Sequence, residues 1–161
     1  MTYEIPNSKR AVLVPALLDK DGQPVYLTDK DFKALGVDWK TFLAAAQQNA
    51  TAELKKLTPE YTRNKKKVIE FATLTSESPL TASVVLSPEF LKMFQQTLGD
   101  KVIVVIPNRY TVFVFPVLAS DYKEYAPMVT DAYHERSHPV STEVYELTDK
   151  GLTTIGLYGD P

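Results

Sequence analysis

The chain has 161 residues, 44% of them hydrophobic and 24% charged, which is enough for one domain with its own core. Its formal net charge of −2 argues against a dedicated nucleic-acid-binding protein, because such proteins are usually clearly basic. The absence of cysteine excludes disulfides, thiolate nucleophiles and cysteine-ligated metals.

The first predicted element is a β-hairpin. AVLVPALL (Ala11–Leu18) and PVYLT (Pro24–Thr28) have strand composition, and DKDG (Asp19–Gly22) joins them as a turn. Pro15 cannot donate a ladder hydrogen bond, so we place it at an edge or a bulge. The same stretch resembles a calcium loop, but its glycine comes too early for that pattern and the closing glutamate is absent. We therefore interpret it as a hairpin turn.

Two helices are predicted next. Thr28 and Asp31 form a capping box for a short helix that ends at Gly36. Asp38 caps a longer helix, whose apolar residues between Trp39 and Leu57 repeat with a spacing near 3.6.

The middle of the chain alternates between predicted strands and a helix. After a charged connector, RNKKK (Arg63–Lys67), strands are predicted at Lys67–Leu74 and Thr81–Leu86. A helix is predicted to start at Ser87-Pro88-Glu89 and to end at Gly99. The connector could contact phosphates, but without interleaved aromatic residues we interpret it as a solvated loop and expect no nucleic-acid partner.

The clearest pattern is an apolar hairpin, KVIVVI (Lys101–Ile106) and YTVFVF (Tyr110–Phe115), joined by PNR. Its residues are apolar on both faces, which is typical of central strands that are covered on both sides. Such a hairpin could also support a protein partner or a homodimer.

The chain closes with a helix, kinked at or beginning at Pro127, and a second hairpin, VYELT and LTTIGLY. No repeat, low-complexity tract or long linker divides the chain. We predict one α+β domain over residues 1–161, with a largely antiparallel sheet, a central two-faced apolar hairpin and helices packed on it.

The segment His134-Glu135-Arg136-Ser137-His138 matches the H-E-x-x-H pattern of zinc metalloproteases and holds the chain's only two histidines. Zinc hydrolysis needs both imidazoles one helical turn apart, a glutamate to activate water, and a third ligand. Pro139 pushes His138 away from helical geometry, and the helix turns both histidines toward solvent. Third-ligand candidates, none at a known spacing, are Glu143, Glu146, Asp149 and Asp160. We expect a frayed helix end and no metal or other cofactor; a zinc-dependent hydrolase using this motif is the alternative.

The turn Pro107-Asn108-Arg109 is the remaining candidate site. Asn108 is a residue that favours tight turns, so turn formation alone can explain it. The turn itself does not require Arg109, whose guanidinium could pair within the fold or bind a carboxylate or phosphate. Asn108 and Arg109 are therefore our predicted ligand- or partner-binding residues, and we predict no catalytic residue.

Five stretches in order resemble the YtpQ-like family of bacterial proteins: RAVLVPALL, VYLTDKDFKALGVDWKTFLAAAQQNA, PLTASVVLSPEFLKMFQQTLG, VIVVIPNRYTVFVF and HPVSTEVYEL. The resemblance spans most of the chain and depends on order and spacing more than on any one motif. Family members are typically longer at the N-terminus, so the resemblance implies that this chain is the core unit. It carries no established activity, and it implies that the proline after His138 belongs to a turn leading into the last hairpin.

Taken together, these patterns predict a binding or interaction domain without catalytic activity. No window approaches the ~18 consecutive apolar residues of a membrane span, and the first residues lack a secretory apolar stretch. We therefore expect a cytoplasmic protein without membrane contact. Its partner, or any small-molecule ligand, has no identifying signature in the sequence.

Overall fold

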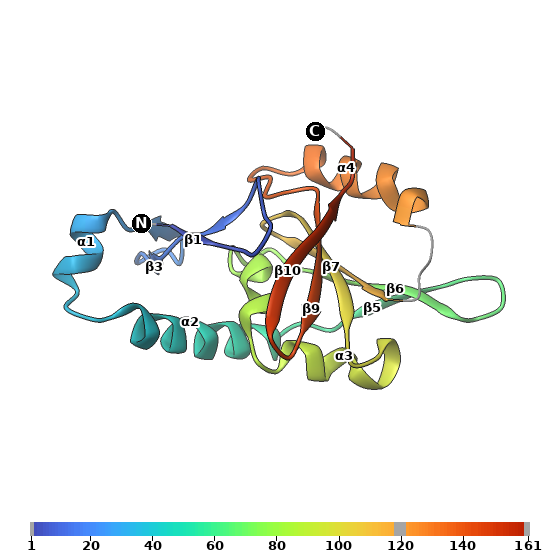
Figure 1. The fold of residues 1–161 in the computed structure, drawn as a ribbon, viewed down its shortest axis with the longest axis horizontal. Coiled ribbons are helices and arrows are strands. Elements are labelled where there is room, and N and C mark those ends of the chain that lie inside the picture. Colours follow the sequence, from blue (N-terminus) through green and yellow to red (C-terminus); the bar gives the residue numbers. More distant parts are fainter. Residues whose placement is uncertain (1, 118–121, 160–161) are drawn as a thin grey trace.

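One six-stranded antiparallel sheet forms the centre of the structure, a computed structural model that describes residues 2–117 and 122–159. Its strands lie in the order β10-β9-β7-β8-β6-β5 (Figure 1). This arrangement confirms the predicted α+β fold with a largely antiparallel sheet. The strands are β5 (Glu60–Arg63), β6 (Ile69–Thr75), β7 (Val102–Asn108), β8 (Thr111–Pro116), β9 (Glu143–Thr148) and β10 (Gly151–Leu157).

The hairpin β7–β8 lies in the middle of this sheet, and both of its faces are buried. As predicted, Val104 and Ile106 belong to one apolar layer, and Ile103 and Val105 belong to the layer on the other face. Helices cover both layers (Figure 1): α2 (Trp39–Leu54), η1 (Thr81–Leu86) and α3 (Phe90–Leu98) on one face, and α4 (Ala126–Glu135) on the other. Because this hairpin is enclosed, it cannot offer the partner or dimer surface that its sequence suggested.

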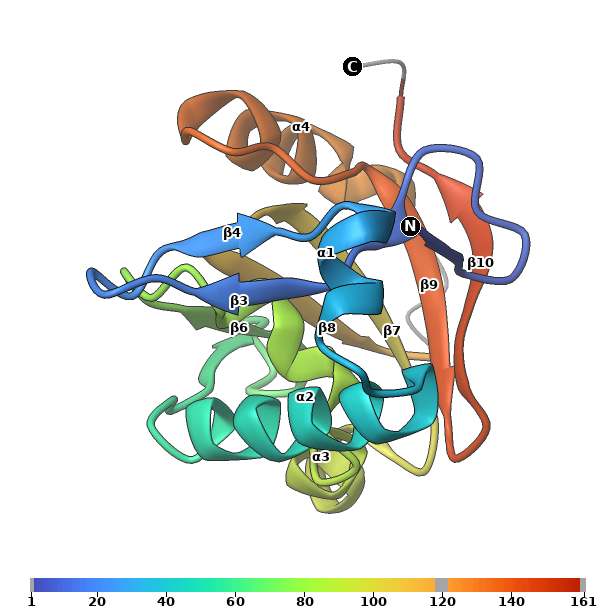
Figure 2. The ribbon, with the colours of Figure 1, turned by 90° about the vertical axis from the view of Figure 1, so that its left-hand side faces the viewer.

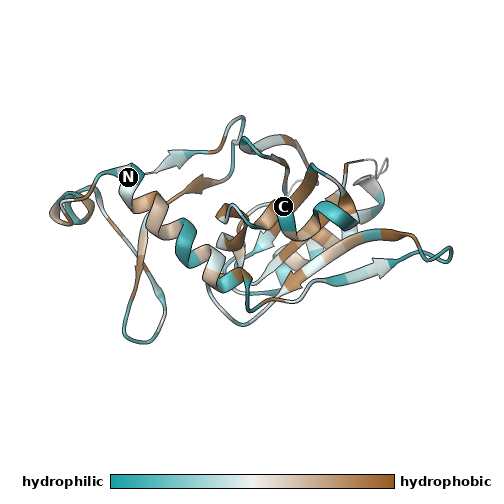
Figure 3. Cartoon of the chain, turned by 90° about the horizontal axis from the view of Figure 1, so that it is seen from below, coloured by the Kyte–Doolittle hydropathy of each residue, from teal (hydrophilic) through white to brown (hydrophobic). Residues whose placement is uncertain are grey.

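The N-terminal hairpin forms as predicted, but it is separate from the main sheet. Pro15 splits the predicted strand Ala11–Leu18 in two. The first part, β2 (Val12–Leu13), pairs with β1 (Tyr3–Glu4), and the second, β3 (Ala16–Leu18), pairs with β4 (Pro24–Tyr26). Figure 2 shows β3 and β4 side by side, with α1 at their end, and in Figure 3 this hairpin projects from the body of the molecule.

Side chains stabilise the β3–β4 turn and cap the N-termini of α1 and α2 at the positions that the sequence predicted. The Asp19 carboxylate accepts hydrogen bonds from the amides of Asp21 and Gln23, which fixes the turn between β3 and β4. The predicted capping box of Thr28 begins α1 (Asp29–Ala34), and the Asp38 carboxylate caps α2.

The prediction of a strand at Thr81–Leu86 is wrong, because this segment forms the 3₁₀ helix η1. Its hydroxyl side chains bond to nearby backbone, with Thr81 donating to the Ser78 carbonyl at 2.8 Å and Ser83 to the Leu80 carbonyl at 2.6 Å. Such local bonds offer the backbone an alternative to a β-ladder and outweigh the strand preference of β-branched residues. The next helix accordingly begins at Phe90, slightly later than predicted.

The connector Arg63–Lys67 lies in the turn of the β5–β6 hairpin, which the sequence analysis did not predict. Its first residue ends the edge strand β5, and the rest turns into β6 at one end of the molecule (Figure 1). Asn64 organises this turn by accepting hydrogen bonds from the amides of Lys66 and Val68. The predicted strand Lys67–Leu74 is confirmed as β6.

The C-terminal elements agree with the sequence. After the short 3₁₀ helix η2 (Tyr122–Tyr125), helix α4 has Pro127 in its first turn, so the proline begins the helix and does not kink it. The last hairpin, β9–β10, is confirmed. In the described part of the chain, no helix is long and apolar enough to span a membrane.

Candidate functional site

The two segments singled out in the sequence, the Pro107-Asn108-Arg109 turn and the segment after α4, lie against each other. The Arg109 amide donates to the His138 carbonyl at 3.1 Å, and the Val140 amide donates to the Pro107 carbonyl at 2.9 Å. Asn108 and Pro139 form an isolated β-bridge between the same segments. The fold therefore brings the two motifs together at one end of the central hairpin.

Asn108 holds this junction together. The residue is 1% exposed; its side-chain nitrogen donates to the Ala132 carbonyl at 2.6 Å, and its side-chain oxygen accepts from the Tyr110 amide at 2.9 Å. Ala132 lies in the last turn of α4, where carbonyls lack partners within the helix. Asn108 therefore caps α4 and shapes the turn at once, and its contact with a ligand or partner stays a prediction.

Arg109 is half-buried, and its side chain makes one hydrogen bond within the described residues, from Nη2 to the Tyr26 hydroxyl at 2.9 Å. A guanidinium carries five N–H donors, so most of its donors are uncommitted. No carboxylate of residues 2–117 or 122–159 pairs with it. This arrangement suits the binding of an external carboxylate or phosphate.

Further cationic and aromatic groups surround Tyr110. The Arg136 guanidinium lies 5.8 Å from the centre of the Tyr110 ring, within the range of a cation–π contact. The His138 ring packs edge-to-face against the Tyr110 ring, with 6.2 Å between the two ring centres. Arg136 also pairs with Glu77 at 3.0 Å, but the Glu77 side chain is 87% exposed, so the pair stabilises the fold little.

The predicted break in the H-E-x-x-H helix is confirmed. Helix α4 ends at Glu135, and Arg136 is already extended, which is earlier than Pro139 alone requires. His134 packs edge-on against Tyr133, whereas His138 packs against Tyr110, and both histidines are exposed. Within the described ranges, no three residues of the types His, Cys, Asp and Glu gather as a metal site would require. Asp160, one proposed third ligand, lies outside the described residues.

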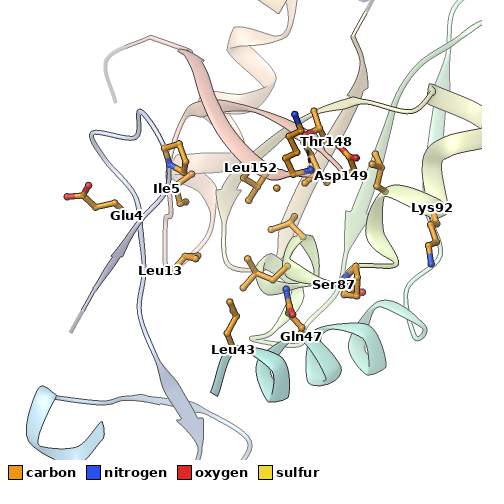
Figure 4. Close-up of a pocket in the computed structure, with 18 of the residues that line it drawn as sticks. Glu4, Ile5, Leu13, Leu43, Gln47, Ser87, Lys92, Thr148, Asp149 and Leu152 are labelled. Carbon is orange, nitrogen blue, oxygen red and sulfur yellow. Dashed lines mark hydrogen bonds between the residues drawn. The ribbon is translucent and has the colours of Figure 1, made fainter. Parts of the chain in front are cut away.

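A cavity of about 650 Å³ lies away from Arg109, and its walls come from four separate parts of the chain. Leu13, Leu43 and Leu152 face it, while Glu4 and Lys92 point away (Figure 4). Its size is that of a small-molecule pocket, and its lining includes the charged residues Asp149 and Lys150 beside aliphatic side chains. Its aliphatic side chains could hold an apolar group.

Sequence reasoning singled out Asn108 and Arg109 as candidates but did not identify the residues that contact them. Arg136 was considered only as the variable position inside a metal motif. Tyr26 lies 83 positions from Arg109, and Glu77 lies 59 positions from Arg136, and neither has a motif around it. Only the three-dimensional arrangement identifies them.

Comparison of the chain with protein-family models, with curated proteins and with solved structures gave no match. The functional argument therefore rests on the geometry around Arg109.

Proposed function

We propose that this protein is a non-enzymatic binding domain that recognises an acidic group on a protein partner through Arg109 and Arg136. One observation carries the proposal: among the described residues, the Arg109 guanidinium makes a single hydrogen bond, to Tyr26, which leaves most of its donors uncommitted. A carboxylate or phosphate is the group whose geometry matches those donors.

The backbone of Arg109 is fixed on both sides, which favours binding. Its amide donates to the His138 carbonyl, and its carbonyl accepts from the Ala82 amide at 2.9 Å. The Tyr26 hydroxyl then orients the end of the side chain. A group positioned in advance loses less conformational freedom when a partner arrives, so more of the interaction energy contributes to affinity.

Arg136 can join the same interaction at little cost. Its present partner, Glu77, is almost fully exposed, so an incoming carboxylate can replace a pair that contributes little. The Tyr110 ring holds the Arg136 guanidinium in place meanwhile.

A binding role also agrees better than catalysis with the surroundings of His138. A catalytic base is normally oriented by a second group that hydrogen-bonds it. In the described part of the chain, the His138 imidazole is exposed and makes a ring contact only, with Tyr110. The resemblance of five ordered stretches of the sequence to the YtpQ-like family of bacterial proteins supports membership of that family and a role in the bacterial cytoplasm.

The test uses two model anions, inorganic phosphate and an acidic peptide made of glutamates, and follows the arginine side-chain signals by nuclear magnetic resonance. We expect both anions to shift the Arg109 signal in a saturable way. Arg109→Ala and Arg136→Ala should each weaken binding several-fold and leave the melting temperature within a few degrees of wild type.

Two controls separate specific recognition from general attraction of anions. Tyr26→Phe removes the hydroxyl that orients Arg109 but leaves the positive charge of Arg109 in place. This variant should therefore weaken binding less than Arg109→Ala does. Lys65→Ala combined with Lys66→Ala removes two exposed cations from the β5–β6 turn and should leave binding unchanged. Binding that survives Arg109→Ala but is lost in the lysine variant would overturn the proposal, as would no binding of either anion. Proteins that co-purify with wild type and not with Arg109→Ala would then identify the partner.

A further inference from the structure

Exposed apolar side chains concentrate in one segment near the N-terminus. In the described residues, thirteen large hydrophobic residues are exposed, and eight of them lie between positions 12 and 37, a segment that we call the arm. These eight are Val12, Val14, Leu17, Leu18, Val25, Tyr26, Leu35 and Val37. A single exposed leucine needs no explanation, but a concentration of this kind marks an interaction surface.

The centre of the arm is the β3–β4 hairpin, which is apolar on both faces. Leu17 pairs with Val25, and the neighbouring pairs, Ala16 with Tyr26 and Leu18 with Pro24, place their side chains on the opposite face. Leu17, Leu18, Val25 and Tyr26 are each between 45% and 57% exposed. A two-stranded hairpin without cover is marginally stable in water, so this one needs further packing beyond what the single chain supplies.

We propose that the arm is a dimerisation surface, on which the arm of a second copy of this chain packs. The eight exposed residues present on the order of 700 Å² of surface, close to the roughly 800 Å² that each partner contributes to a standard interface. The hairpin forms its own two-stranded sheet, so neither β3 nor β4 pairs with a further described strand. Either free edge can pair with the same strand of a second copy.

The charges of the arm favour a second copy over a strongly charged partner. Residues 12–37 contain four acids and three bases, so two arms can meet without strong repulsion between like charges. The free edge of the main sheet at β10 is less suited to pairing, because part of it is already covered: the Thr154 amide donates to the Pro6 carbonyl at 2.9 Å. The edge at β5 ends in the charged turn Arg63–Lys67, which discourages strand addition.

The test is the molar mass of the full chain in solution, measured by sedimentation from micromolar to submillimolar concentration. We expect the mass to rise toward twice the chain mass of 18.1 kDa. Leu18→Glu combined with Val25→Glu should keep the mass at that of one chain, because it places carboxylates on both faces of the hairpin. Both residues are about half exposed, at 50% and 51%, so the variant should fold with an unchanged circular dichroism spectrum.

A matched variant, Ile155→Glu combined with Leu157→Glu, tests whether any loss of exposed apolar surface has the same effect. These residues are 52% and 44% exposed but lie on β10, so this variant should dimerise like wild type.

Hydrogen exchange adds a measurement that requires no mutation: amides of the arm should exchange more slowly at high than at low protein concentration, and the exchange rates of the β10 amides should not change. A wild-type chain that stays at the mass of one chain throughout overturns the proposal. A dimer that persists in the arm variant, or is lost in the β10 variant alone, overturns it as well.

Discussion

The hydroxyl of Ser8 donates a 2.7 Å hydrogen bond to the carboxylate of Glu143, which lies 135 positions later in the chain. The same carboxylate accepts from the Lys9 amide at 2.8 Å and from the Tyr145 hydroxyl at 3.1 Å. Glu143 is 3% exposed. Burial raises the pKa of Tyr145 well above its ordinary value, so the phenol keeps its proton and stays a donor. Glu143 therefore joins the N-terminal segment to the sheet as a buried, hydrogen-bonded anion.

Replacing Glu143 should make the protein less stable and less sensitive to acid. Burial raises the pKa of this carboxyl, but the bonds from Lys9, Ser8 and Tyr145 outweigh burial, and the net pKa is lowered. A lowered pKa in the folded state stabilises the protein above the unfolded pKa, roughly 4.3, and this stability is lost as the pH falls through the folded value. Glu143→Gln should cost about 1–3 kcal/mol at neutral pH, measured by urea unfolding.

The contribution of Glu143 to acid sensitivity is isolated by comparing Glu143→Gln with the replacement of a second glutamate on β9. In Glu143→Gln, the unfolding free energy should fall less between neutral and acid pH than in wild type. It should still fall, because the pKa of Glu53 is also lowered, through its hydrogen bonds with Ser78 and Lys56 against the raising effect of burial. Glu146→Gln, three positions along β9, should retain the wild-type pH profile. An unchanged profile in Glu143→Gln would mean that its carboxylate does not clamp the N-terminal segment.

The second prediction tests the centre of the sheet. Val104 is fully buried between its neighbours on β8 and β9, so Val104→Asp would place an unpaired charge in the core. The cost is several kcal/mol against a total stability of about 5–15 kcal/mol, and the variant should be largely unfolded by circular dichroism. Val68→Asp, at a position that is 58% exposed, should melt close to wild type. A folded Val104→Asp variant with wild-type melting would show that the hairpin is not central.

The third prediction concerns the amide of Asn108. In Asn108→Asp the side chain has nearly the same shape, but an oxygen replaces the nitrogen that donates to the Ala132 carbonyl. Two acceptors then face each other, while the bond from the Tyr110 amide can persist. The variant should lose roughly 1–3 kcal/mol, and the last turn of α4 should exchange its amides faster than in wild type. Faster exchange confined to other helices would rule out Asn108 as the cap of α4.

The elements that could be predicted from sequence are those whose signal is local. The capping box of Thr28, the cap at Asp38 and the continuous apolar run in β7 each depend on a few neighbouring residues. Thr81–Leu86 was assigned incorrectly because its strand-like composition competes with hydroxyl bonds that also form locally.

The candidate site could be predicted only in part, for a related reason. Arg109 stands out in the sequence because nothing in a turn requires it, whereas Tyr26 and Glu77 reach the site from distant segments. The Glu143 clamp is equally non-local, since its partners lie at the other end of the chain. Contacts of this kind depend on tertiary packing, which no short window of sequence specifies.

The last prediction concerns zinc. A working site needs neutral imidazoles that converge with a third ligand at about 2.0–2.1 Å from the metal. Here His134 lies in the last turn of α4, whereas His138 lies beyond its end in a left-handed conformation, with φ at 67°. Zinc per chain, measured by atomic spectroscopy on tag-free protein purified without chelators, should be far below one.

His134→Ala tests the same point through stability and metal content together. His134 is exposed, and replacing such a residue usually changes stability by less than ~0.5 kcal/mol, so the variant should melt within a few degrees of wild type. His138→Ala is the companion variant and should cost slightly more, because it removes the ring contact with Tyr110. If wild type instead carried one zinc per chain and His134→Ala lost it, the two histidines would have to converge in solution. A hydrolase using His134, Glu135 and His138 would then replace the binding domain as the better account of this protein.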